Sequence, residues 1–230
     1  MQRHIDEELS RFKEMLLTMA SHAASAVTNA MKSLTERDDE LARLVQSNDS
    51  ILDGLEKRVD EMAIALLAQA PLASDLRLIT VGMKISHDLE RVGDEATNIA
   101  RRSIEVNKEP QLKPYVDLPR MAEMALTMLQ ETLDAFVHRD SAKARAVIPR
   151  DKMVDALNKQ LYRELVSYVI EDPQRTTRCL HLMFISKSLE RIADHAASIS
   201  EEVVYLYEGR DIRHDKPGSN VPDTTAPPAA

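Results

Sequence analysis

One sixteen-residue segment occurs twice in this chain, and the duplication limits the possible fold more than any other feature of the sequence. ISHDLERVGDEATNIA begins at Ile85 and ISKSLERIADHAASIS begins at Ile185, with eight of the sixteen positions identical. A repeat at this spacing indicates that each half of the 230-residue chain builds the same structural unit. We therefore expect two similar halves related by internal duplication.

The composition predicts that this unit is helical. Aromatic residues make up 3% of the chain, tryptophan is absent, and only five glycines occur. The abundant alanine, leucine, methionine, glutamate and arginine are good helix formers. We predict an all-α fold made of two tandem antiparallel three-helix bundles.

Hydrophobic periodicity places three helices in the first half. Apolar residues spaced by three and four predict a first helix from Ile5 to about Leu34. The second helix is expected from about Leu41 to Gln69, with a break near Asn48. Pro71 then separates it from a third helix over 74–107, because proline suits the first turn of a helix.

The second half repeats this pattern, with helices expected over 118–137, 140–170 and from 172 or 173 to 208. Pro149 should break the middle helix just before Asp151, because proline disrupts a helix interior. The resulting division is a first repeat over 1–109, a proline-containing linker over 110–119, a second repeat over 120–208 and a tail over 209–230. The tail is polar and proline-rich, so we expect it to be disordered after a C-terminal cap at Gly209.

Each copy of the repeated segment contains a glutamate and an aspartate four residues apart, Glu90 with Asp94 and Glu190 with Asp194. Residues at this spacing lie on the same face of a helix, with Cβ atoms about 5–6 Å apart. Two carboxylates held this close repel each other unless a positive charge lies nearby. The duplicated acidic pair is therefore the main indication of function.

The preceding helix of each half carries its own acidic pair. Asp53 is 18 residues before Pro71 and Glu90 is 19 residues after it, so antiparallel helices joined there bring the two pairs to the same height. At about 100° per residue, both pairs face the same outer groove. The eight candidate metal ligands are Asp49, Asp53, Glu90, Asp94, Asp151, Asp155, Glu190 and Asp194. Such oxygen ligands suit Mg, Mn or Fe ions, and Zn where a histidine joins them.

Other polar residues near these pairs have simpler interpretations. Arg91 and Arg191 follow the two glutamates and are expected to balance neighbouring acids, with contact to a partner or an anion as the alternative. His195, beside Asp194, is a candidate auxiliary metal ligand. A chain with 38 acidic residues contains some acidic pairs by chance, and we interpret Glu56 with Asp60 as one of these.

Charge and targeting signals narrow the function further. The formal net charge of −8 argues against direct binding to nucleic acid, because phosphate backbones attract basic surfaces. The single cysteine, Cys179, cannot form an intramolecular disulfide, and the first residues lack the apolar core of a signal peptide. No apolar run is long enough to cross a bilayer. We expect a cytoplasmic protein that meets membranes only indirectly, through partners.

The motifs Leu-Glu-Arg-Val-Gly-Asp and Leu-Glu-Arg-Ile-Ala-Asp, with their partner Asp-x-x-x-Asp pairs, resemble those of the PhoU family. The resemblance covers about residues 1–208, and one departure is Ala193, where the first copy has Gly93. It implies a homodimeric, non-enzymatic regulator that represses the phosphate-starvation response when phosphate is plentiful. Such proteins work with the ATPase of the phosphate ABC transporter and a phosphate-sensing histidine kinase. Some members hold multinuclear metal clusters on similar acidic pairs.

Two other functions remain open at this point. A metal-dependent hydrolase or phosphatase is conceivable, because carboxylate-bound cations can activate water. A ferritin-like oxidase is disfavoured, since no histidine here has a glutamate three positions before it. A metal-free helical adaptor would instead use its acidic grooves to receive lysine or arginine side chains from a partner.

Overall fold

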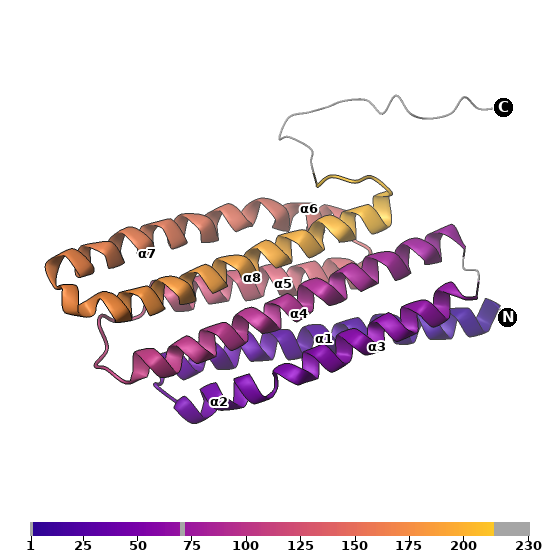
Figure 1. Ribbon diagram of the computed structural model, residues 1–230. Coiled ribbons are helices and arrows are strands. Elements are labelled where there is room, and N and C mark those ends of the chain that lie inside the picture. The colour runs from indigo at the N-terminus through magenta and orange to yellow at the C-terminus, as the bar shows by residue number, and fades with distance from the viewer. Residues whose placement is uncertain (1, 70–71, 214–230) are drawn as a thin grey trace.

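The computed structural model describes residues 2–69 and 72–213, and all regular secondary structure within them is helical (Figure 1). The first repeat contains α1 (Gln2–Thr35), α2 (Asp39–Ser47), α3 (Asp49–Leu67) and α4 (Ala73–Asn107). The predicted break at Asn48 is confirmed, because this residue separates α2 from α3. Pro71, which we expected to separate the second and third helices, lies outside the described residues.

The second repeat contains α5 (Asp117–His138), α6 (Ser141–Val147), the short 3-10 helix η1 (Ile148–Arg150), α7 (Asp151–Glu171), a second 3-10 helix η2 (Pro173–Arg175) and α8 (Thr176–Glu208). Pro149 lies in η1, so the predicted break before Asp151 is confirmed. The last α-helix begins at Thr176, later than expected. The carboxylate of Asp172 accepts a hydrogen bond from the Gln174 amide and thereby starts η2 as a separate turn.

Equivalent polar residues set the turn after the first helix of each repeat. The carboxylate of Asp38 accepts a hydrogen bond from the Leu41 amide at the start of α2. The carboxylate of Asp140 does the same for the Lys143 amide at the start of α6. These side chains satisfy amides that have no partner inside the helix. The same local sequence thus builds the same turn twice.

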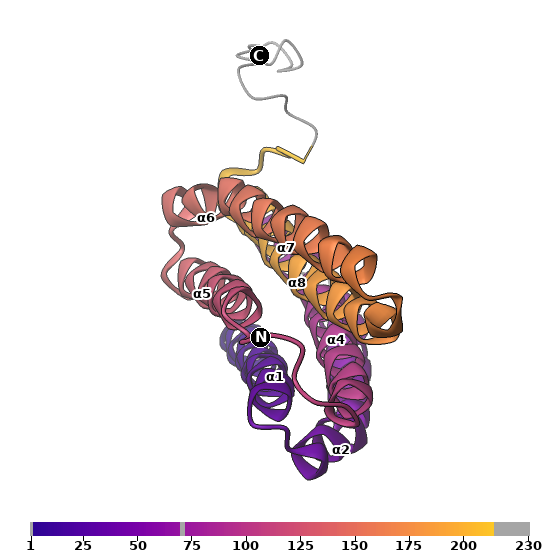
Figure 2. The same cartoon turned by 90° about the vertical axis from the view of Figure 1, so that its left-hand side faces the viewer.

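The two repeats lie side by side and share one hydrophobic core (Figure 2). Within the first repeat α1 packs against α4, and between the repeats α4 packs against α8 and α1 against α5. Long apolar side chains on these facing surfaces, such as Phe12, Ile85 and Leu189, are completely buried. Burial of this kind contributes about 1.5–3 kcal/mol for each large side chain. The association of the repeats is therefore part of the core.

Charged side chains also cross between α4 and α8. Nζ of Lys84 lies 3.0 Å from Oε1 of Glu202, and the guanidinium of Arg102 lies 4.3 Å from the ring centre of Phe184. Residue numbers rise along one helix as they fall along the other, so the two helices are antiparallel. The duplicated segments therefore face each other at the centre of the molecule.

The linker and the start of the tail are more ordered than the sequence suggests. The linker is shorter than expected, since α5 begins at Asp117 and Pro119 lies in its first turn, where proline is tolerated. Gly209 ends α8 with a φ of 71°, as the predicted C-terminal cap requires. Arg213 lies 3.4 Å from Glu202, so this part of the predicted tail contacts α8. The tail beyond 213 lies outside the described residues.

Among the described helices, none combines the length and the apolar character that crossing a bilayer requires.

Candidate metal-binding grooves

The acidic pairs of the second repeat meet in a groove between α7 and α8. Asp155, Glu190 and Asp194 each place one carboxylate oxygen within 4.8 Å of the others. Asp155 comes from α7, whereas Glu190 and Asp194 lie one turn apart on α8. Asp151, one turn before Asp155, adds further negative charge close to Asp194. The spacing expected from the two helices therefore brings Asp155, Glu190 and Asp194 together, whereas the predicted ligand Asp151 lies outside this group.

The groove holds more negative charge than its surroundings neutralise. Partial burial raises the pKa of Asp194 to about 6, and repulsion from Glu190 and Asp155 adds to the effect. Lys187, which forms an ion pair with Glu190, acts in the opposite direction on the pKa of Asp194. A cation bound beside this carboxyl group would favour its ionised form.

The first repeat forms a similar groove between α3 and α4. Burial raises the pKa of Asp94, and repulsion from Asp49 and Asp53 raises it further. Burial also raises the pKa of Glu90, with Asp94 as the next cause. Oε2 of Glu90 is buried and has no hydrogen-bond partner among the described residues. Asp94 therefore interacts electrostatically with Asp49 and Asp53 on the neighbouring helix and with Glu90 on its own helix. Within the described residues, Asp49, Asp53 and Asp94 do not belong to a group of three whose ligand atoms lie within 4.8 Å of one another.

Two further residues enter this groove that the sequence did not identify. Glu56, His87 and Glu90 each place one ligand atom within 4.8 Å of the others. Nδ1 of His87 lies 3.2 Å from Oε1 of Glu56. Glu56, which we interpreted as a chance neighbour of Asp60, therefore lies in a group that could bind a metal ion. Its position three residues after Asp53, matched by His87 three residues before Glu90, was the available signal.

The equivalent positions in the second repeat carry different chemistry. Asn158 stands where the first repeat has Glu56, and its Oδ1 accepts a hydrogen bond of 2.6 Å from Ser186. Lys187 stands where the first repeat has His87, and its ammonium group pairs with Glu190. At this position the first groove therefore offers an imidazole nitrogen, while the second has an ammonium group that pairs with its glutamate.

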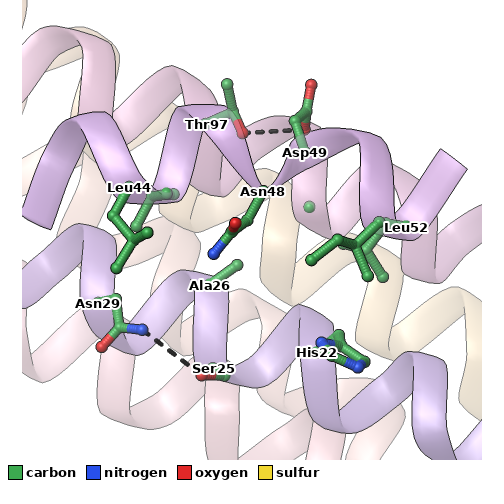
Figure 3. A pocket seen from close by; sticks show the side chains of 12 residues that line it. His22, Ser25, Ala26, Asn29, Leu44, Asn48, Asp49, Leu52 and Thr97 are labelled. Carbon is green, nitrogen blue, oxygen red and sulfur yellow. Dashed lines mark hydrogen bonds between the residues drawn. The ribbon is translucent and has the colours of Figure 1, made fainter.

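A small cavity lies beside Asp49, at the junction of α2 and α3 (Figure 3). Oδ1 of Asp49 accepts a hydrogen bond of 2.9 Å from the hydroxyl of Thr97, drawn as a dashed line in Figure 3. His22 and Asn48 also line the cavity, whose volume is about 70 Å³. This space suits a few water molecules, since water occupies about 30 Å³ each in the liquid. Thr97 fixes the orientation of Asp49, a role that Ala197 cannot fill in the second repeat.

Arg91 balances the acids of its own helix, as expected. Its Nη1 donates a hydrogen bond of 2.9 Å to Oδ2 of Asp94, and its Nε lies 3.4 Å from Oε2 of Glu90. The alternative role of Arg91 in contacting a partner or an anion stays a prediction.

Arg191 and His195 bridge the two repeats instead. Nη1 of Arg191 lies 3.0 Å from Oε1 of Glu95, and Nδ1 of His195 lies 2.9 Å from Oδ1 of Asp88. Both acids belong to α4. The structure thus pairs Arg191 within the protein and places His195 outside the group formed by Asp155, Glu190 and Asp194. The predicted roles of Arg191 in anion contact and of His195 as an auxiliary ligand gain no support from this geometry.

A model of the PhoU domain matches residues 16–103 and again residues 118–203, once in each repeat. The chain belongs to the PhoU family. Among its PhoU relatives, a protein of Rhizobium meliloti described as a phosphate-specific transport system accessory protein PhoU homolog is 38% identical over 221 residues, covering 95% of this chain and 93% of the relative. A protein of Aquifex aeolicus with the same description is 41% identical, covering 90% of this chain and 95% of the relative.

Solved PhoU structures resemble the whole helical assembly. The crystal structure of PhoU from Pseudomonas aeruginosa has a TM-score of 0.86 and 39% identity, and covers 89% of this chain and 99% of its own. The structure of the phosphate transport system regulatory protein PhoU from Streptococcus pneumoniae has a TM-score of 0.84 and 29% identity, over 90% of this chain and 98% of its own. The predicted family and the predicted all-α fold are therefore confirmed.

Proposed function

We propose that this protein regulates phosphate uptake and represses the phosphate-starvation response when phosphate is plentiful. It would act in the cytoplasm as a homodimer, through the ATPase of the phosphate ABC transporter and a phosphate-sensing histidine kinase. The observation that carries the proposal is the pair of duplicated acidic grooves on a fold whose relatives are named as accessory proteins of phosphate transport. In this proposed role the protein transmits a signal without turning over a substrate, which agrees with the description of its relatives as accessory proteins.

The donor atoms of the grooves fit metal ions. Oε2 of Glu90 is a buried oxygen without a hydrogen-bond partner in the described residues, and burial with repulsion raises the pKa of Asp194 to about 6. Both features indicate negative charge that a cation would stabilise. Mg, Mn or Fe would bind through the carboxylates, and Zn would bind where His87 joins. Such ions would cross-link α3 to α4 and α7 to α8.

A metal-free adaptor is the second candidate, and one observation favours it. Arg91 and Lys187 already place positive side chains on Asp94 and Glu190. The grooves could then exchange these internal cations for lysine or arginine side chains of a partner. Elemental analysis of the purified protein separates the two candidates, since only the first predicts bound metal that is lost when Asp94 and Asp194 are both changed to Ala.

The regulatory role is tested by deleting the gene and measuring phosphatase expression in high phosphate. We expect expression to rise, and we expect the wild-type gene to restore repression. The variant Glu61→Gln serves as a control, because Glu61 is an exposed acid of α3 outside both grooves. Unchanged repression in the deletion strain would overturn the proposed function, whatever the metal content of the protein.

A further inference from the structure

A cavity of about 520 Å³ lies at the end of the molecule where α4 starts. The linker that joins α4 to α5 is at the opposite end of the bundle (Figure 1). The cavity is open to solvent on one side and is lined by α1, the start of α4 and the C-terminal ends of α5 and α8. Three basic side chains line it, together with two acidic ones: Lys13, Arg77, Arg139, Asp6 and Asp75. The cavity is separate from both acidic grooves.

Two of these basic groups have no ion-pair partner among the described residues. In the described part of the chain, neither the ammonium of Lys13 nor the guanidinium of Arg139 forms a hydrogen bond or an ion pair. Burial lowers the pKa of Lys13, and the charge of Arg139 lowers it further, against the weaker opposing effect of Asp75. Like charges are therefore held close together on one side of the cavity.

The arginine equivalent to Arg139 in the first repeat has hydrogen-bond acceptors. Arg37 occupies in the first repeat the place that Arg139 occupies in the second, and both have a φ of 58°. Nη2 of Arg37 donates hydrogen bonds of 2.5 Å and 2.7 Å to the backbone carbonyls of Asn107 and Glu109. The last residue of α4 and the segment directly after it thus supply the acceptors for Arg37.

A second arginine at each end of the molecule, near the start of the last helix of a repeat, shows the same difference. Arg178 opens α8 as Arg77 opens α4, and Nε of Arg178 lies 2.6 Å from a carboxylate oxygen of Glu109. Nη1 of Arg178 also donates a hydrogen bond of 2.7 Å to the carbonyl of Pro110. Arg77 instead makes a long hydrogen bond of 3.4 Å to the carbonyl of Leu206, and its guanidinium lies 5.7 Å from the ring centre of Tyr205. A segment with one carboxylate, that of Glu109, therefore occupies one end of the molecule, while the described residues leave a cavity at the related place at the other end.

We propose that this cavity binds a peptide segment of a partner protein that contains a glutamate, with the carboxylate between Lys13 and Arg139 and a backbone carbonyl at Arg77. The internal linker is the template for the bound segment, because it pairs one carboxylate and several carbonyls with the equivalent arginines. Charge-assisted hydrogen bonds to arginine are shorter and stronger than neutral ones. The proposal does not depend on phosphate regulation or on metal binding.

The test uses a fluorescent peptide with the sequence of residues 106–112 and its Glu109→Gln form, titrated with the full-length protein in an anisotropy assay. We expect saturable binding of the glutamate peptide and about tenfold weaker binding of the glutamine form, the effect of one lost charge-assisted hydrogen bond. Arg139→Gly removes the guanidinium while favouring the positive φ, and Lys13→Ala leaves that turn untouched. Each variant should also weaken binding about tenfold. Arg120→Ala, at an exposed arginine of α5 outside the cavity, should not.

Three results would overturn the proposal. The first is an absence of saturable binding by the glutamate peptide, and the second is equal binding of the two peptides. The third is equal affinity of the Arg139→Gly, Lys13→Ala and Arg120→Ala proteins, each checked for folding by circular dichroism. Inorganic phosphate is titrated alone as a separate arm. Binding of phosphate in this cavity without binding of the peptide would assign the site to a small oxyanion instead.

Discussion

Cδ1 of Leu52 lies 2.2 Å from the position that a Cβ atom on Gly93 would occupy, so these two residues set the distance between α3 and α4. The corresponding pair in the second repeat is Val154 and Ala193. Valine is smaller than the leucine that it replaces, and alanine is larger than the glycine that it replaces. Both residues of that pair are completely buried. The departure of the second motif from the first is therefore compensated by its neighbouring helix. Because Gly93 is next to Asp94, this contact also positions the first acidic groove.

Replacing Gly93 with Ala should destabilise the protein by about 1–3 kcal/mol, the usual cost of overpacking a core. Each kcal/mol corresponds to a fall of about 2–4 °C in Tm for a chain of this size. Combining Gly93→Ala with Leu52→Val should recover most of the loss, because it recreates the pair found in the second repeat. Thermal unfolding followed by circular dichroism measures both effects.

Gly54→Ala is the matched control for this experiment. Gly54 lies in α3, and no atom would lie within 4 Å of a Cβ atom placed there. Alanine favours a helix over glycine by about 1 kcal/mol, so this variant should raise Tm. The packing argument fails if the two glycine variants behave alike, or if Leu52→Val gives no recovery.

Changing Asp194 to Asn should stabilise the metal-free protein at neutral pH and have little effect near pH 4. The pKa of Asp194 is about 6 in the folded protein, above its ordinary value of 3.8. The folded state therefore binds more protons than the unfolded state between these values, and the stability of the wild type falls as pH rises through this range. An uncharged side chain removes that loss.

The measurement is Tm of both proteins in chelator, from below pH 4 to above pH 7. The expected gain at neutral pH is on the order of 2 °C, since solvent screens part of the repulsion at this half-exposed site. A difference in Tm that is the same at every pH would contradict a raised pKa of Asp194.

The loss of stability on breaking the ion pair between Arg191 and Glu95 should depend on which of the two side chains is changed. The Glu95 side chain is 9% exposed and that of Arg191 is 54% exposed. Arg191→Ala leaves a buried carboxylate unpaired and should cost about 1–3 kcal/mol. Glu95→Gln leaves no buried charge, so its cost should be smaller. Urea unfolding of both variants compares them, and equal losses would show that the burial of Glu95 is not the deciding factor.

The two grooves should differ in their preference for metals, a prediction that depends on the metal-binding proposal. Removing the imidazole with His87→Ala should weaken Zn binding to the first groove by at least about tenfold. Mn binding should stay largely unchanged, because Mn favours oxygen ligands. Lys187→Ala should strengthen metal binding to the second groove, because it frees Glu190 from its internal cation. Equilibrium dialysis with elemental analysis measures both, with Glu61→Gln as the control.

Local sequence was sufficient to predict most of the helical elements. The break at Asn48, the 3-10 turn at Pro149 and the cap at Gly209 each depend on residues within one or two turns of the chain. The common height of the acidic pairs was also predictable, because residue counts from a helical hairpin fix positions along its axes. The sequence by itself therefore determined the fold class, the duplication and the approximate location of the grooves.

Only the tertiary structure decided which side chains meet across neighbouring helices. Glu56 and His87 share the first groove because α3 approaches α4 with a rotation set by contacts such as that of Leu52 with Gly93. Arg191 and His195 pair with Glu95 and Asp88 because α8 packs against α4. Spacing within a helix fixes the face on which a side chain lies. The partner of that face depends on the close packing of apolar residues far apart in the chain.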